Sequence, residues 1–127
     1  MKKRFLPLPL LLLTACVEPM AYPGQLDKQA AVAAQSSATP VDQIALTQAA
    51  TINGGRYKEL GQIEASVGKV TAFHPTPSVA DAEKKLRIEA AELGADAVIN
   101  AKIGAPHICP LSWSCRDVSG TAVALPK

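Results

Sequence analysis

The chain has 127 residues, which is enough for one domain with its own core and leaves no room for a second sizeable one. Hydrophobic residues make up 48% of the sequence but aromatic residues only 4%, so the expected core is built from small aliphatic side chains. The formal charge is +2 and falls to −1 without the three N-terminal cations Lys2, Lys3 and Arg4, and neither value has the strongly basic balance of a nucleic-acid-binding protein.

The first fifteen residues have the pattern of a secretory signal peptide. A basic head precedes an apolar run from Phe5 to Leu13. The run has about half of the roughly 20 residues that a membrane-spanning helix needs, and two prolines interrupt it, so a permanent transmembrane helix is the weaker interpretation. The next residues, Leu13-Thr14-Ala15-Cys16, resemble the lipobox of bacterial lipoproteins. That resemblance implies cleavage before Cys16 and its lipidation, whereas an ordinary secretory signal would leave Cys16 as a free thiol.

The lipobox resemblance also implies where the protein lies. Lipobox cysteines take a diacylglycerol on the thiol and usually a third chain, such as palmitate, on the new amino group. Two or three acyl chains make membrane attachment effectively permanent. In bacteria with two membranes, an Asp directly after the acylated cysteine commonly retains a lipoprotein in the inner membrane, and Val17 stands there instead. We therefore expect an outer-membrane lipoprotein whose domain faces the periplasm.

Residues 16–41 are expected to form the lipidated N-terminus and a flexible tether. The stretch is rich in Ala, Gln, Ser and Pro and has no sustained helical or strand periodicity. A flexible chain of this length has an end-to-end distance of about 25 to 30 Å, which would hold the domain clear of the lipid. Residues Gln25 to Gln35 permit a short helix, which is expected to pack on nothing because the stretch is poor in large apolar residues.

Residues 42–127 are expected to fold as a small α+β domain whose clearest element is a helix from Ser78 to Leu93. Ser78 is a suitable N-cap, Asp81 lies in the first turn, and Gly94 suits the position after the last turn. Apolar residues recur at steps of three and four and predict one buried stripe. The stripe consists of Val79, Ala82, Leu86, Ala90 and Leu93.

Strands are expected on both sides of this helix, in the order β-β-α-β-β. Alternation after Gly94 places Ile99, Ala101 and Ile103 on one face of a strand. The last strand is small or apolar on both faces, which favours a central position, and its Gly120 indicates a bulge or a close backbone contact. An Asn-Gly-Gly turn separates the first two strands. The four expected strands span residues 43–49, 57–65, 96–103 and 117–125. The predicted fold is thus one main helix packed on a sheet.

Two blocks of this domain resemble the YbjQ-like domains: Ala90-Ala91-Glu92-Leu93-Gly94-Ala95-Asp96-Ala97-Val98-Ile99 and Ser119-Gly120-Thr121-Ala122-Val123. The RcsF-like envelope lipoproteins are similar in layout, with a lipobox, a Pro/Ala-rich tether, a segment comparable to Tyr57 to Ile63, and a cysteine-bearing loop before the final strand. The resemblance covers roughly Ile44 to Leu125. It implies a compact α/β domain that senses envelope damage through contacts with outer-membrane assembly proteins and a signalling partner.

The cysteines depart from the RcsF-like pattern, in which four are paired. Once Cys16 is lipidated only Cys109 and Cys115 remain, so one bridge is possible. An oxidising periplasm and a short loop favour a structural disulfide between them. A thiolate metal site with His107 is the sharper alternative, but a structural zinc takes four ligands and His74 is the only other histidine. A redox-active pair is the third alternative, although the spacing lacks the two-residue gap of thioredoxin-like motifs. No metal or other cofactor is expected.

Trp113, the only tryptophan, lies inside the cysteine loop. It would either cover one end of the core or serve as a rigid contact residue for a partner. No nucleophile motif or phosphate-binding glycine loop is present, so the protein is not expected to be an enzyme and no small-molecule substrate is evident. The sequence therefore predicts a lipid-anchored periplasmic binding or sensing module that acts through protein contacts. The alternative is a metal-binding or purely structural envelope lipoprotein.

Overall fold

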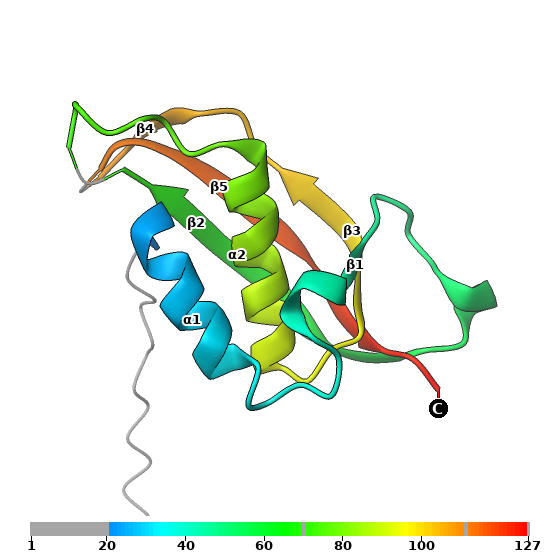
Figure 1. Ribbon diagram of the computed structural model, residues 1–127. Coiled ribbons are helices and arrows are strands. Elements are labelled where there is room, and N and C mark those ends of the chain that lie inside the picture. Colours follow the sequence, from blue (N-terminus) through cyan, green and yellow to red (C-terminus); the bar gives the residue numbers. More distant parts are fainter. Residues whose placement is uncertain (1–20, 70, 111, 127) are drawn as a thin grey trace, which may run out of the picture.

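The computed structural model describes residues 21–69, 71–110 and 112–126 (Figure 1). It confirms the small α+β fold, in which one main helix lies across a curled sheet of five strands. The predicted signal peptide, Cys16 and Val17 lie outside the described residues. No helix in the described ranges has both the length and the apolar character needed to cross a membrane. The α-helices are α1 (Leu26–Ala33) and α2 (Val79–Glu92), and the strands are β1 (Ala45–Leu46), β2 (Lys58–Gly68), β3 (Ala97–Ile103), β4 (His107–Cys109) and β5 (Ser112–Ala124).

Strand β5 is the centre of the sheet, as its apolar character predicts. It pairs antiparallel with β2 on one side and with β3 on the other, and β1 adds to β3 in parallel. Its start at Ser112 lies earlier than expected, because this first part pairs with the short strand β4, which the sequence did not predict. The cysteine-bearing segment is consequently a β-hairpin continuous with the central strand.

Helix α2 begins and ends where its sequence predicts. The hydroxyl of Ser78 accepts a hydrogen bond from the Asp81 amide at 3.1 Å, while the Asp81 carboxylate accepts one from the Ser78 amide at 3.0 Å. This reciprocal pair satisfies two N–H groups that the first turn leaves without helical partners. Gly94 follows the helix with a φ of +76°, a conformation that glycine adopts without steric cost.

The buried stripe of α2 is confirmed at its centre and differs at its ends. Ala82, Leu86 and Ala90 are fully buried against the sheet, whereas Val79 and Leu93 are about half exposed. Ile88 and Ala91 are buried as well, so more than one side of the helix is covered.

That second cover is α1, which corrects the expected tether. Leu26 and Ala33 of α1 are buried, Gln29 accepts a hydrogen bond from the buried Lys85 at 3.2 Å, and Asp27 forms an ion pair with Lys84. The expectation that this helix packs on nothing is wrong, because two apolar residues seven positions apart lie on one face after two turns. The part of the predicted tether from Ala21 to Val41 lies against the domain.

A bulge in β3 changes which of its residues share a face. The register with β5 shifts between Ile99 and Lys102, and Asn100 inside the shift has a φ of +52°. The extra residue reverses the alternation, so the expectation that Ile99 faces the same way as Ala101 is wrong. Ile99 packs with Val123 in a small cluster, while Ala101 belongs to the core under α2.

Candidate functional site

The β4–β5 hairpin contains most of the residues that the sequence singled out. A disulfide joins Cys109 and Cys115, whose Cα atoms are 6.1 Å apart. Cys115 is fully buried and lies opposite His107 in the strand register, and Cys109 lies opposite Ser112. The bridge therefore fastens the outer strand of the hairpin to the buried Cys115 of β5.

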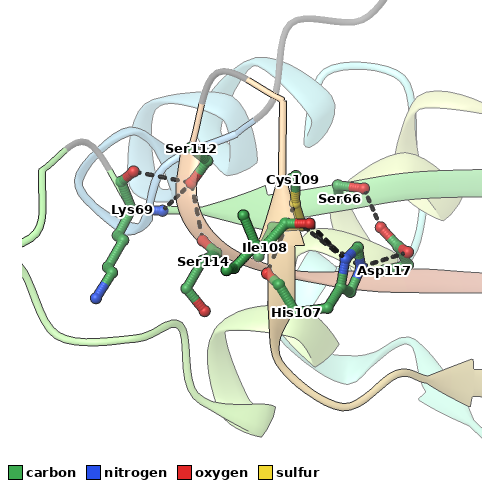
Figure 2. Close-up of a disulfide and its surroundings, with 9 residues drawn as sticks. Ser66, Lys69, His107, Ile108, Cys109, Ser112, Ser114 and Asp117 are labelled. Carbon is green, nitrogen blue, oxygen red and sulfur yellow. Dashed lines mark hydrogen bonds and ion pairs between the residues drawn. A yellow bond between two sulfur atoms is a disulfide. The ribbon is translucent and has the colours of Figure 1, made fainter.

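A polar cluster fastens the start of β5, beside the turn of the hairpin, to Lys69 at the end of β2 (Figure 2). The Lys69 amide donates to the Ser112 hydroxyl at 3.1 Å and to the Ser114 carbonyl at 3.1 Å. The Ser112 hydroxyl itself lies 2.8 Å from the Ser114 carbonyl and 2.9 Å from that of Lys69, and it donates its one hydrogen to either. The hairpin is thus held by hydrogen bonds as well as by the disulfide.

His107, Asp117 and Ser66 form a second polar group, on the side of the hairpin that carries the disulfide. His107 Nε2 lies 2.8 Å from Asp117 Oδ2, and the Ser66 hydroxyl donates to Asp117 Oδ1 at 2.5 Å. The hydrogen bond to Asp117, followed by one with the Ile108 carbonyl, raises the pKa of His107 above its ordinary 6.5. The Ser66 hydroxyl, followed by His107, lowers the pKa of Asp117 below 3.8. Each group therefore favours the charged form of the other.

This group places a cysteine, a histidine and an aspartate together, which the sequence did not predict. The sulfur of Cys115 lies 3.5 Å from His107 Nε2 and 3.8 Å from Nδ1. A catalytic triad needs the nucleophile on one ring nitrogen and the carboxylate on the other, but here both approach Nε2 most closely. The sulfur is also bonded to Cys109 and is no thiolate. The arrangement does not match that of an activated cysteine.

Sequence reasoning missed Asp117 and Ser66 because no motif contains them. Cys115 and Asp117 are two residues apart on β5, so alternation puts them on one face. His107 joins them only through the register of β4, and Ser66 only through that of β2, where it lies opposite Asp117. The spacing of Cys115 and Asp117 was the available signal, because it puts both side chains on one face of a strand. It points to a site only once the pairing of β4 with β5 is known.

The hairpin also contains a possible metal-ligand set. The ligand atoms of His107, Cys109 and Cys115 all lie within 4.8 Å of one another. While the disulfide is closed the sulfurs bind each other, and reduction would provide two thiolates beside one imidazole. His74 is not part of this group, and its Nδ1 lies 2.7 Å from the Thr71 hydroxyl. The set has three ligands, one fewer than a structural zinc site takes.

Trp113 does not cover the core, since 64% of its surface is exposed. Ile108 on the neighbouring strand is 85% exposed. Ile108 lies between His107 and Cys109 on β4, opposite the stretch of β5 between Ser112 and Cys115 that contains Trp113 and where the register shifts. The hairpin thereby presents two large apolar side chains on a cross-linked support. The chain matches no model of a known protein family, and no curated protein is significantly similar to it in sequence.

Proposed function

We propose that this chain is the precursor of an outer-membrane lipoprotein whose domain acts in the periplasm as a binding or sensing module. Leu13-Thr14-Ala15-Cys16 supports cleavage and acylation at Cys16, and Val17 supports sorting to the outer membrane. The module acts through protein contacts and not through catalysis, in the manner implied by the RcsF-like resemblance. Outer-membrane assembly proteins and signalling proteins are the proposed classes of partner.

The observation that carries this proposal is the exposure of Trp113 and Ile108 on a closed hairpin. Tryptophan is enriched among the residues that contribute most to protein interfaces. A side chain on a support that is already rigid loses little conformational entropy on binding, because the backbone is ordered beforehand. The disulfide and the Lys69–Ser112 hydrogen bonds give the hairpin this order.

Purification of the lipoprotein in mild detergent, with mass spectrometry of the accompanying proteins, tests the proposal. The Trp113→Ala variant is compared with Val32→Ala, because both side chains are 64% exposed and Val32 lies on α1. Wild type and Val32→Ala should recover the same envelope proteins, and Trp113→Ala should lose them. Recovery of the lipoprotein alone from wild-type cells would contradict the proposal.

A metal-binding function is the second candidate, because His107, Cys109 and Cys115 converge. It requires the reduced form, in which two thiolates and an imidazole suit Cu(I) or Zn²⁺. Calorimetric titration of the purified protein with each metal, before and after reduction, tests it. Binding that appears on reduction and is lost in Cys115→Ser would favour this function, whereas no binding after reduction would remove it.

A further inference from the structure

One end of the molecule gathers exposed apolar side chains from two segments. Phe73, between β2 and α2, is 98% exposed, and Ile108 and Trp113 of the hairpin are 85% and 64% exposed. In Figure 1 this segment and strand β4 of the hairpin lie at the same end, away from the C-terminus. Arg116 holds them together, since its Nε donates to the Pro77 carbonyl at 2.6 Å. Large apolar side chains gathered at one exposed end mark a contact surface.

The charges of these two segments suit an anionic surface. Residues 69–77 and 107–115 contain no aspartate or glutamate, but they contain Lys69, His74 and His107. The Asp117 carboxylate lies beside His107, with Oδ2 2.8 Å from Nε2, and places a negative group next to that imidazole. Phosphate headgroups approaching this end would meet its apolar side chains together with Lys69 and His74.

The chain joins the domain at this same end. The Ala21 amide donates to the Ser66 carbonyl at 3.3 Å, and the Ala21 carbonyl accepts from the Gly68 amide at 2.8 Å. Gly68 lies opposite Cys115 in the sheet. Ala21 is therefore about two strand spacings, or roughly 10 Å, from the start of β5. The first described residue is thus fixed on β2, one strand away from the hairpin strand β5.

Only a short length of chain separates this fixed point from the proposed lipid anchor. Ala21 follows Cys16 by five residues. Five residues span at most about 18 Å, even when fully extended. The headgroup layer itself is roughly 5 to 8 Å thick on each side of a bilayer. The acyl chains therefore keep the hairpin end of the domain close to the lipid surface, in place of the 25 to 30 Å clearance expected for a tether.

We infer that the surface formed by Phe73, Ile108 and Trp113 rests on the lipid surface of the membrane that holds the protein. This inference rests on the proposed acylation of Cys16. Tryptophan favours the headgroup layer, where its ring lies against acyl chains and its N–H reaches water or phosphate. A protein partner that binds Trp113 then replaces lipid at the same surface.

Quenching of Trp113 fluorescence by brominated lipid tests this contact directly, because the chain has one tryptophan. The acylated protein is reconstituted into phosphatidylethanolamine/phosphatidylglycerol vesicles with bromine on the acyl chains. The matched variant Trp113→Phe/Val32→Trp moves the single indole to an equally exposed position on α1. We expect a blue-shifted emission and loss of most of its intensity for Trp113, and neither effect for the indole at position 32.

Equal quenching at both positions, or none at either, would overturn the contact. A second variant, Phe73→Ser/Ile108→Ser, should reduce the quenching of Trp113, whereas Val32→Ser should leave it unchanged; equal effects of the two would also overturn it. The mass of the N-terminal peptide is measured on the same sample. An unacylated Cys16 would refute the proposed lipoprotein and the inference with it, whereas an acylated Cys16 without quenching would refute the inference alone.

Discussion

His107 and Asp117 connect the pH of the solution to the stability of the hairpin. The pKa of His107 is raised, so its contribution to stability is fully present below its unfolded pKa of about 6.5 and is lost as the pH rises through the higher folded value. The pKa of Asp117 is lowered, so its contribution is present above about 3.8 and is lost as the pH falls through the lower folded value. The pair stabilises the fold most between these two limits.

Asp117→Asn should therefore make the free energy of unfolding less dependent on pH in the range from about pH 6 upward. The substitution removes the largest cause of the raised His107 pKa. In the wild type, the free energy of unfolding should fall as the pH rises from about 6 through the folded pKa of His107. Urea unfolding at a series of pH values measures this slope. His107→Gln is the control and should flatten it as well; an unchanged slope in both variants would contradict the role of the pair.

Gly120 is a residue whose missing side chain matters. A Cβ built there would overlap the Val98 side chain and lie 3.3 Å from the Ile99 carbonyl oxygen. Gly120→Ala should therefore force Val98 and the neighbouring strand apart and cost about 1 to 3 kcal/mol of stability. Gly104→Ala is the matched control, because its Cβ would come no closer than 3.4 Å to other atoms. Equal denaturant midpoints for the two variants would show that the sheet yields at Gly120.

At the scale of single elements, the disulfide hairpin should contribute measurably to stability. A bridge that closes a loop of seven residues removes roughly 2 to 2.5 kcal/mol of unfolded-state entropy in the chain-entropy estimate. The Cys109→Ala/Cys115→Ala variant should lose about this much, measured by urea unfolding. The wild type with reductant should show a similar loss. No difference between the oxidised protein and the variant would mean that the bridge stabilises nothing beyond the hydrogen bonds of Lys69 and Ser112.

The attachment of α1 to the domain can be tested in the same way. Leu26→Ala should destabilise the protein by about 2 to 5 kcal/mol, because this side chain is buried and its truncation leaves a cavity beside α2. The exposed Val32 on the same helix is the control, and Val32→Ala should change little. If Leu26→Ala lowered the free energy of unfolding no more than Val32→Ala, α1 would not be packed on the domain and would belong to a flexible tether.

These elements differ in how far their sequences predicted them. The bounds of α2 followed from local chemistry, because Ser78, Asp81 and Gly94 act within a few residues of themselves. Helix α1 was misjudged because its burial depends on only two apolar residues and on the distant Lys85. The orientation of Ile99 depended on a bulge, which alternation alone does not reveal. The hairpin was missed because Cys109 and Ser112 pair across a turn that has no hairpin motif.

For the whole molecule, the decisive quantity is the length of chain between the proposed lipid anchor at Cys16 and the domain. Composition predicted a tether of residues 16–41, but Ala21, the first described residue, is already bonded to β2. The residues between Cys16 and Ala21 act as a linker, so a contact between the hairpin end and the membrane is intramolecular. The effective concentration for such a contact falls roughly as the −3/2 power of the linker length. With Cys16 acylated as proposed, the short linker before Ala21 therefore favours contact between the hairpin end and the membrane surface.

Lengthening this segment should weaken the lipid contact without altering its surface. An insert of about twenty Gly and Ser residues between Met20 and Ala21 makes this linker roughly five times longer. The ratio of lipid-bound to free hairpin should then fall by about tenfold. Quenching of Trp113 in brominated vesicles measures this ratio. An insert of the same composition after Pro126 does not change the linker length and should leave the quenching of Trp113 unchanged. Undiminished quenching with the long linker would show that the apolar surface binds lipid by its own affinity. The short segment before Ala21 would then not be needed for the contact.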